Sequence, residues 1–219
     1  MTGGAGGTGG VAGEVAGELV ERAAGLAAGG RALLGITGEP GAGKSTLAEG
    51  LHRALAERGV PAALVGMDGF HLADRSLREL GLVGVKGAPE TFDAAGYVAL
   101  LRRLRAAAPD EVVWAPEFRR EIEDAIAGSV PVGPAVSLVL TEGNYLLLDG
   151  PWRPVRGLLD EVWFVDPPER RRRSWLAERH QRYGRTPEQA WERTLGSDER
   201  NARTVATTRH LADLLVSPG

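Results

Sequence analysis

The sequence contains no cysteine, which excludes disulfide bonds and thiolate metal sites within the chain and fits a reducing compartment. No apolar run approaches the ~20 residues that cross a bilayer, and the N-terminus lacks a basic region followed by an apolar core. The net charge of −3 provides no excess of positive charge for holding a nucleic acid. We therefore expect a cytoplasmic protein with no nucleic-acid or membrane partner. A homodimer is compatible with the sequence.

What is present indicates one folded unit. The 219 residues, 43% of them hydrophobic and 25% charged, have the length and composition of one globular α/β domain. Glycine dominates residues 1–10, which cannot bury enough surface to offset the entropy of ordering them. We predict a disordered tail over residues 1–10 and a single domain over residues 11–219. That domain would begin with a helix from Val11 that ends at the Gly29-Gly30 pair.

The strongest motif is the run Gly38-Glu39-Pro40-Gly41-Ala42-Gly43-Lys44-Ser45, which fits the pattern G-x-x-x-x-G-K-[ST]. Residues 32–37 before it predict a short buried strand, and residues 45–58 after it predict a helix. The glycines allow backbone N–H groups to point at phosphate oxygens, and the helix N-terminus adds positive charge there. We expect Lys44 to reach the β- and γ-phosphates of ATP or GTP, and the Ser45 hydroxyl to ligate Mg²⁺. The predicted nucleotide-binding residues of this loop are Gly38, Glu39, Pro40, Gly41, Ala42, Gly43, Lys44, Ser45 and Thr46.

Two acidic residues directly follow predicted strands. Residues 61–67 predict a strand that runs into Asp68, and residues 135–141 predict one that runs into Glu142. Because ligands of open parallel sheets lie beyond the carboxyl ends of the strands, both carboxylates are expected at the site. Asp68 can accept a proton from an attacking hydroxyl or hold a water on Mg²⁺; Glu142 can contact the metal or orient the acceptor. The alternatives are a capping role for Asp68 and a structural role for Glu142.

Several other residues could face a phosphoryl acceptor. His71 is either a substrate contact or a partly buried histidine, and Lys86 and Glu90 belong to a polar loop over residues 73–93 that could equally be solvated. Residues 111–133 predict a strand, an excursion and a return, which would form a flap beside the acceptor pocket. Its Arg120 could bind an anionic acceptor, although a charge run is usually a solvated face. The candidate acceptor-binding residues are Phe70, His71, Lys86, Glu90, Arg120, Asn144 and Tyr145.

The remaining elements include an arginine-rich helix. It follows a predicted strand over residues 161–165, and Asp166 is expected to cap it. Arginines entering a nucleotide site would neutralise charge on the transferring phosphoryl group, and helical spacing places Arg172 and Arg179 on one face. Asp93 is predicted to cap a helix over residues 94–107. Thr186 precedes a further helix, residues 197–199 are expected to cap the last helix, which reaches about residue 210, and residues 212–216 predict a final strand.

Taken in order, these motifs resemble the phosphoribulokinase/uridine kinase group of P-loop kinases over about residues 30–216. The segments that carry the resemblance are the phosphate loop, Asp68-Gly69-Phe70, Lys86-Gly87-Ala88-Pro89-Glu90-Thr91-Phe92-Asp93, Glu142-Gly143-Asn144 and the arginine-rich segment around Arg179-His180. The resemblance implies an α/β three-layer P-loop sandwich with a mainly parallel central sheet. It also implies a helical lid over about residues 168–186 and a small acceptor-side flap over about residues 111–133.

Within the group, the motifs point in different directions. Uridine kinases carry Asp-Ser-Phe-Tyr where this chain has Asp68-Gly69-Phe70-His71, and they hold the ribose with an aspartate where this chain has Gly87. The Asp-Gly-Phe and Lys-Gly-x-Pro-Glu segments look more like bacterial pantothenate kinase. The overall likeness is to short bacterial kinases described as nucleoside/nucleotide or fructose kinase-like. The motifs alone do not select one acceptor.

We therefore expect a kinase that uses ATP and Mg²⁺ to phosphorylate an alcohol group of a small metabolite: a nucleoside, a pantothenate-like compound or a sugar. The resemblance implies that Asp68 is the general base and that Arg179 grips the phosphates, with Arg172 and Arg173 as weaker matches. The expected catalytic residues are Asp68, Lys44, Arg179 and Glu142, and the expected metal ligands are Ser45 and Glu142. The alternatives are a nucleotide-dependent switch or a binding-only protein that acts on a protein partner.

Overall fold

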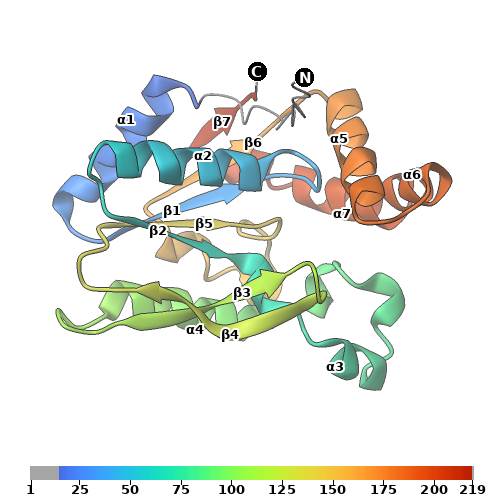
Figure 1. Ribbon diagram of the computed structural model, residues 1–219, viewed down its shortest axis with the longest axis horizontal. Helices are drawn as coiled ribbons and strands as arrows, with labels where there is room; N and C mark the ends of the chain where they lie inside the picture. The colour runs from blue at the N-terminus through green and yellow to red at the C-terminus, as the bar shows by residue number, and fades with distance from the viewer. Residues whose placement is uncertain (1–14, 219) are drawn as a thin grey trace, which may run out of the picture.

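The computed structural model describes residues 15–218 and places five parallel strands in one central sheet. The strand order is β2-β5-β1-β6-β7, so the strand that leads into the phosphate loop lies in the middle (Figure 1). The bounds of these strands are β1 Ala32–Thr37, β2 Ala62–Gly66, β5 Leu138–Glu142, β6 Glu161–Val165 and β7 Leu214–Val216. Their short apolar runs fit a sheet that is covered on both faces.

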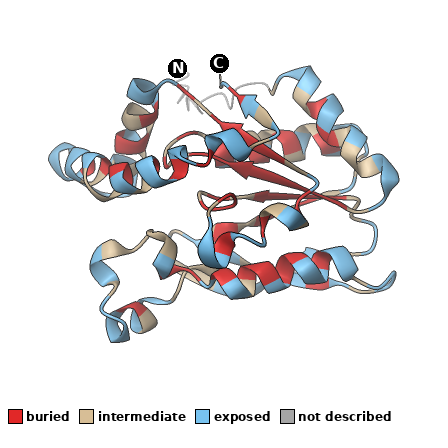
Figure 2. Cartoon of the chain, turned by 180° about the vertical axis from the view of Figure 1, so that it is seen from behind, coloured by how far each residue is buried: buried red, intermediate tan, exposed pale blue. Residues whose placement is uncertain are grey.

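Helices and a β-hairpin cover the two faces of this sheet. Helices α1 (Gly17–Leu26) and α2 (Lys44–Glu57) lie on one face, and α4 (Ala94–Ala106) lies on the other with the separate hairpin β3 (Val113–Arg119) and β4 (Asp124–Val132) (Figure 1). The buried side chains form two clusters, as Figure 2 illustrates along the strands and the inner side of α4. Successive residues of β1, β2, β5 and β6 alternate between these clusters because side chains along a strand point to opposite faces. This arrangement confirms the predicted three-layer α/β sandwich.

Three helices gather at the end of the sheet where the phosphate loop lies: α5 (Glu169–Arg182), α6 (Pro187–Leu195) and α7 (Ser197–Ala206) (Figure 1). The start of α6 is explained by its sequence, since the Thr186 hydroxyl accepts from the N–H of Gln189 and the Gln189 side chain accepts from the N–H of Thr186. Within residues 15–218, no helix is long and apolar enough to cross a membrane.

Most predicted elements are present, but several local predictions were wrong. Asp93 does cap α4, where it accepts from the N–H of Gly96. Asp166 does not cap α5: it accepts two hydrogen bonds from Arg209 instead, and the helix begins after Pro168. The predicted loop over residues 73–93 contains a short helix, α3 (Asp74–Glu79).

The C-terminal helix also differs from the prediction. Gly196 takes the N-cap position of α7, and no side chain caps this helix. The carboxylates of Asp198 and Glu199 are bonded to side chains of α5 instead. The helix ends at Ala206, and a separate 3₁₀ turn covers Arg209–Leu211. The predicted disordered tail over residues 1–10 and the predicted helix start at Val11 lie outside the described residues.

Candidate active site

The phosphate loop between β1 and α2 has a backbone that glycine alone adopts easily. The φ angles of Gly38, Gly41 and Gly43 are 146°, 82° and 95°. A Cβ at residue 38 would lie 2.6 Å from the carbonyl oxygen of Val165, and one at residue 41 would lie 2.8 Å from that of Arg172. The loop is therefore held against β6 and α5, with the first turn of α2 directly behind it.

Lys44 occupies the centre of this loop. Its side chain is only 8% exposed, and its ammonium donates to the carbonyl oxygen of Glu39 at 3.0 Å. Burial lowers the pKa of Lys44 to about 8, while the charge of Glu142 opposes this shift. A buried cation beside glycine amides and a helix N-terminus fits a triphosphate, because each of these groups stabilises negative charge.

Two oxygen ligands suited to Mg²⁺ lie next to the loop. Ser45 is at the start of α2, and its hydroxyl donates to the Glu142 carboxylate at 3.3 Å. Burial raises the pKa of Glu142, and the charge of Asp68 raises it further. Across residues 15–218, no three His, Asp or Glu side chains converge on a metal position. A site of one hydroxyl and one carboxylate nevertheless fits Mg²⁺, which usually keeps several waters and binds substrate phosphates.

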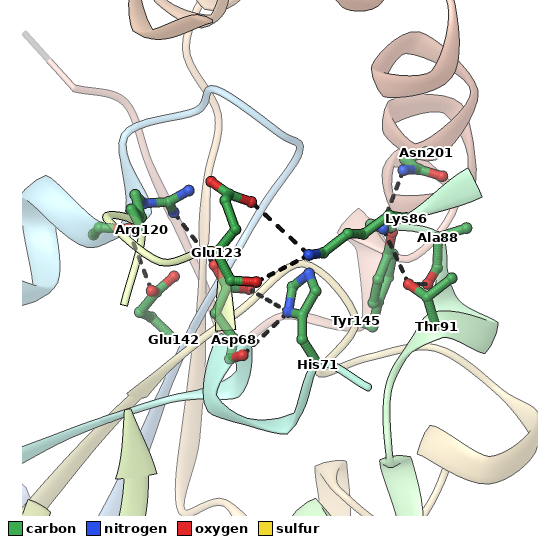
Figure 3. A network of polar contacts seen from close by, with 12 residues as sticks. Asp68, His71, Lys86, Ala88, Thr91, Arg120, Glu123, Glu142, Tyr145 and Asn201 are labelled. Atoms are coloured by element: carbon green, nitrogen blue, oxygen red, sulfur yellow. Dashed lines mark hydrogen bonds and ion pairs between the residues drawn. The ribbon is translucent and has the colours of Figure 1, made fainter. Parts of the chain in front are cut away.

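Asp68 lies beside Glu142, at the edge of the sheet where β2 and β5 end. Gly66 of β2 is paired with Glu142 of β5, and Asp68 follows in a 3₁₀ turn over Met67–Phe70. The Asp68 carboxylate is partly exposed and lies 3.4 Å from the Arg120 guanidinium, as Figure 3 shows. The Asp68 charge acts on the pKa values of Lys44, Glu142 and Arg179, so the carboxylate lies near the phosphate loop.

Close packing against the flap requires glycine at position 69, directly after Asp68. A Cβ at residue 69 would lie 2.7 Å from the carbonyl oxygen and 2.9 Å from the carbonyl carbon of Pro116 in β3. The flap backbone thus packs directly on the turn that carries Asp68, and the serine of uridine kinases would not fit here without a shift.

We expect Gly69→Ala to lower kcat/KM about 10- to 100-fold, because displacing the flap from the Asp68 turn moves groups that must be aligned. The measurement is steady-state kinetics with a working acceptor, together with the Tm of each variant. Gly133→Ala is the matched control, since a Cβ there meets nothing within 4 Å. Equal activity of both variants would show that the close packing on Pro116 does not position Asp68.

Two aromatic candidates differ in their surroundings. Phe70 packs edge-on against Tyr97, with ring centroids 5.3 Å apart, so it belongs to the core more than to the acceptor space. His71 lies between Phe92 and Phe118, at centroid distances of 3.9 and 4.9 Å, and its Nδ1 is 3.1 Å from the carbonyl oxygen of Asp68. Burial lowers the pKa of His71, which favours its neutral form.

The loop around Lys86 is fixed from both sides. The Lys86 ammonium donates to Asp74 at 2.7 Å. It also donates to the carbonyl oxygen of Glu123 at 3.0 Å (Figure 3). The carbonyl oxygen of Gly87 accepts from the Tyr145 hydroxyl and from the Asn201 amide. Lys86 and Tyr145 therefore bind protein groups in this structure, and their contact with an acceptor stays a prediction.

The last two acceptor candidates lie apart from each other. Glu90 is exposed and lines a small cavity with residues of α7, and Asp68 does not line that cavity. Asn144 is half-buried, and its carbonyl oxygen accepts from the Thr37 hydroxyl at 3.3 Å. Glu90 is thus not brought together with the other site residues, whereas Asn144 follows β5 next to the phosphate loop.

The predicted arginines separate into two groups. Arg172 is 2% exposed, pairs with Glu39 at 2.7 Å and with Glu199 at 2.9 Å, and donates to the carbonyl oxygen of Pro40. Arg173 also pairs with Glu199, at 2.7 Å. Both arginines therefore have acidic partners in this structure, and their contact with the nucleotide stays a prediction.

Arg179 is different. It is half-buried on α5. Burial and the nearby Arg120 charge lower the pKa of Arg179, while the charges of Asp68 and Glu142 oppose that shift. Within the described part of the chain, its guanidinium has no hydrogen bond or ion pair. An arginine held near two carboxylates and Lys44 without a partner of its own is suited to an incoming anion.

Sequence reasoning missed the residues that fix these groups. Glu199 holds the two arginines, Asn201 holds the Gly87 carbonyl, and Arg193 donates to the carbonyl oxygen of Lys86 at 3.2 Å. The high arginine content of α5 was the one sequence feature that could have indicated acidic partners in another element.

The chain is similar to known nucleotide-binding proteins and kinases. The family model of the methylmalonyl Co-A mutase-associated GTPase MeaB matches residues 11–71. A candidate uridine kinase of Schizosaccharomyces pombe is 34% identical over 85% of this chain and 83% of its own length. A pantothenate kinase of Mycolicibacterium vanbaalenii is 29% identical over 61% of this chain, which spans only 43% of that enzyme.

A solved structure extends the comparison. The crystal structure of a candidate fructose transport system kinase from Silicibacter sp. TM1040 superimposes with a TM-score of 0.79 at 40% identity, covering 86% of this chain and 90% of that one. The uridine kinase and fructose kinase matches cover 85% and 86% of this chain, whereas the GTPase match ends at residue 71. This chain belongs to the phosphoribulokinase/uridine kinase group of P-loop kinases, enzymes that phosphorylate small molecules.

Proposed function

We propose that the protein transfers the γ-phosphoryl group of ATP to an alcohol group of a small metabolite, with Asp68 as the general base. The observation that carries this proposal is the position of the Asp68 carboxylate. It is partly exposed at the sheet edge shared with Glu142, opposite the phosphate loop, and no backbone N–H within the described residues uses it as a cap. A carboxylate in this place can accept the hydroxyl proton as the hydroxyl attacks.

The other residues supply positioning and charge. Lys44 and the loop amides would hold the β- and γ-phosphates, and Arg179 would stabilise the charge of the transferring group. Ser45 and Glu142 would hold Mg²⁺, which when bound neutralises phosphate charge. Phosphoryl transfer requires little covalent chemistry from the protein. Alignment of the acceptor hydroxyl with the phosphoryl group would therefore provide most of the acceleration of the transfer.

The direct test is ADP release, measured by a coupled assay with Mg·ATP against nucleosides, pantothenate, fructose and related sugars, and ribulose 5-phosphate. We expect one class of alcohol to raise ADP production well above the rate without acceptor. Mass spectrometry of the product must then show one added phosphoryl group on that alcohol. ATP binding without acceptor-dependent ADP release for any alcohol would count against a kinase and favour a nucleotide-dependent switch.

Nucleotide affinity should depend on pH through Lys44. Its pKa of about 8 in the free protein means that Lys44 loses its proton as the pH rises through 8, whereas bound phosphates favour the charged ammonium. The Kd for ATP should therefore rise above pH 8, by up to about tenfold per pH unit, with uptake of one proton on binding. Calorimetry in buffers of different ionisation enthalpy measures both quantities. A Kd that is constant from pH 7 to 9.5 would contradict this role, and Lys44→Met should abolish the pH dependence.

A further inference from the structure

We infer that the acceptor alcohol carries a negatively charged group, a carboxylate or a phosphate, which the Arg120 guanidinium binds. The inference rests on the proposed kinase function, since it names the chemical class of that site's acceptor. Arg120 directly follows β3 at the tip of the flap, and 35% of its side chain is exposed. Figure 3 shows it extending from the flap toward Asp68.

Arg120 has more hydrogen-bonding capacity than the protein uses. Its guanidinium carries five N–H donors, and one of them makes a long contact of 3.4 Å with Asp68. Among residues 15–218, no other carboxylate lies within ion-pair distance of it. The rings of Phe118 and Tyr183 lie 6.0 and 5.9 Å from its central carbon, one from the flap and one from the end of α5. Aromatic neighbours of this kind hold a guanidinium in place while its planar edge stays available to an anion.

The other cations near the site already have partners or another role. Lys86 is bonded to Asp74, the neighbouring Arg119 is paired with Glu117 at 2.8 Å, and Lys44 belongs to the phosphate loop. Arg179 has no partner, but it extends from α5, the helix that packs on the phosphate loop. Once the nucleotide engages Lys44 and Arg179, Arg120 is the cation that remains on the acceptor side of Asp68.

The turn that carries Arg120 is held in a fixed shape. Glu123 has a φ of 52°, which is unfavourable for a residue with a side chain, and its carbonyl oxygen accepts from the Lys86 ammonium at 3.0 Å. Lys86 is held in turn by Asp74 and by the fold of its own loop. The protein thus maintains a strained turn at the place where it presents Arg120, as expected for a residue that must be positioned before a ligand arrives.

The geometry also limits the size of the acceptor. The Arg120 guanidinium and the Asp68 carboxylate are adjacent, so the anionic group and the reacting hydroxyl must lie within a few bonds of each other. A compact hydroxy acid or sugar phosphate meets this condition, with Phe118 and His71 providing an apolar wall. Arginine binds carboxylate and phosphate alike through two parallel hydrogen bonds, so the charge, not the identity of the anion, is the recognised feature.

The test uses pairs of alcohols in which a neutral group replaces the charged one: D-glycerate and glycerol, and fructose 6-phosphate and fructose. We expect a charged member to be phosphorylated with a kcat/KM at least about tenfold above that of its neutral partner, consistent with a charge-assisted bidentate contact. Arg120→Gln should remove most of this difference, chiefly by raising KM for the charged member. Arg119→Gln is the matched control, because Arg119 points to Glu117 on the same flap. The carboxylate and phosphate pairs show which anion is accepted.

Three results would overturn the inference. If a neutral alcohol is the better substrate of its pair, the inference is wrong and the kinase function stands. If Arg120→Gln lowers kcat/KM equally for both members of a pair, Arg120 acts on Asp68 or on the nucleotide and not on an acceptor charge. If no alcohol of either kind is phosphorylated while ATP binds, both this inference and the proposed function fail.

Discussion

The Asp68→Asn variant is expected to lose about 10²- to 10⁴-fold in kcat while its Kd for Mg·ATP changes little. Asparagine preserves the size of the side chain and an oxygen that can accept from Arg120, but it cannot take up the hydroxyl proton at neutral pH. The phosphate loop is untouched, because Lys44 is anchored on Glu39 and not on Asp68. Steady-state kinetics with the working acceptor, and calorimetry with a non-hydrolysable ATP analogue, measure the two quantities.

The control for this substitution is Asp110→Asn, since Asp110 is exposed in the loop after α4. It should keep wild-type kcat and Kd. A kcat for Asp68→Asn within twofold of wild type would show that another group accepts the proton. Glu142 would then be the next residue to test, because its pKa is raised by burial and it borders the same space.

The sequence was sufficient to predict those parts of the site that depend on local backbone geometry. The bounds of β1 and β6 agree with the expected residues, because short apolar runs followed by glycine or proline define buried strands clearly. The phosphate loop needs glycine at fixed positions because its backbone has positive φ angles there, so the motif predicts the loop conformation. Asp68 and Glu142 could be placed at one edge because parallel strands align their carboxyl ends.

The partners of the charged side chains could not be predicted in the same way. Asp166 and the acidic residues at the start of α7 have the composition of helix caps, yet they bind arginines and a histidine of other elements. An ion pair between residues far apart in the sequence leaves no local sequence pattern, whereas a helix cap has a preferred residue type at a fixed position. Helix-capping preferences therefore led us to predict that these carboxylates cap the nearest helix. The ion pairs of Arg172 with Glu39 and Glu199 could not be predicted for the same reason.

Arg172→Met is expected to lower the free energy of unfolding by about 3–5 kcal/mol, the range found when one member of a buried ion-pair network is removed. Arg172 is almost fully buried and joins Glu39 of the phosphate loop to Glu199 of α7. Methionine fills part of the space but leaves the Glu39 carboxylate without a countercharge, and burial already raises the pKa of that carboxylate. Urea denaturation followed by circular dichroism measures the loss.

The matched control is Arg171→Met on the same turn of α5, where the side chain is exposed and lies over Trp175. Its stability should stay within about 1 kcal/mol of wild type. Adding Glu39→Gln to Arg172→Met should recover part of the lost stability, because a neutral amide needs no countercharge. If Arg172→Met lowers the free energy of unfolding by less than about 1 kcal/mol, the buried ion pairs do not stabilise the fold, since an exposed ion pair contributes that much. If the loss is large and ATP binding weakens with it, Arg172 serves the nucleotide by holding the loop in shape and not by touching phosphate.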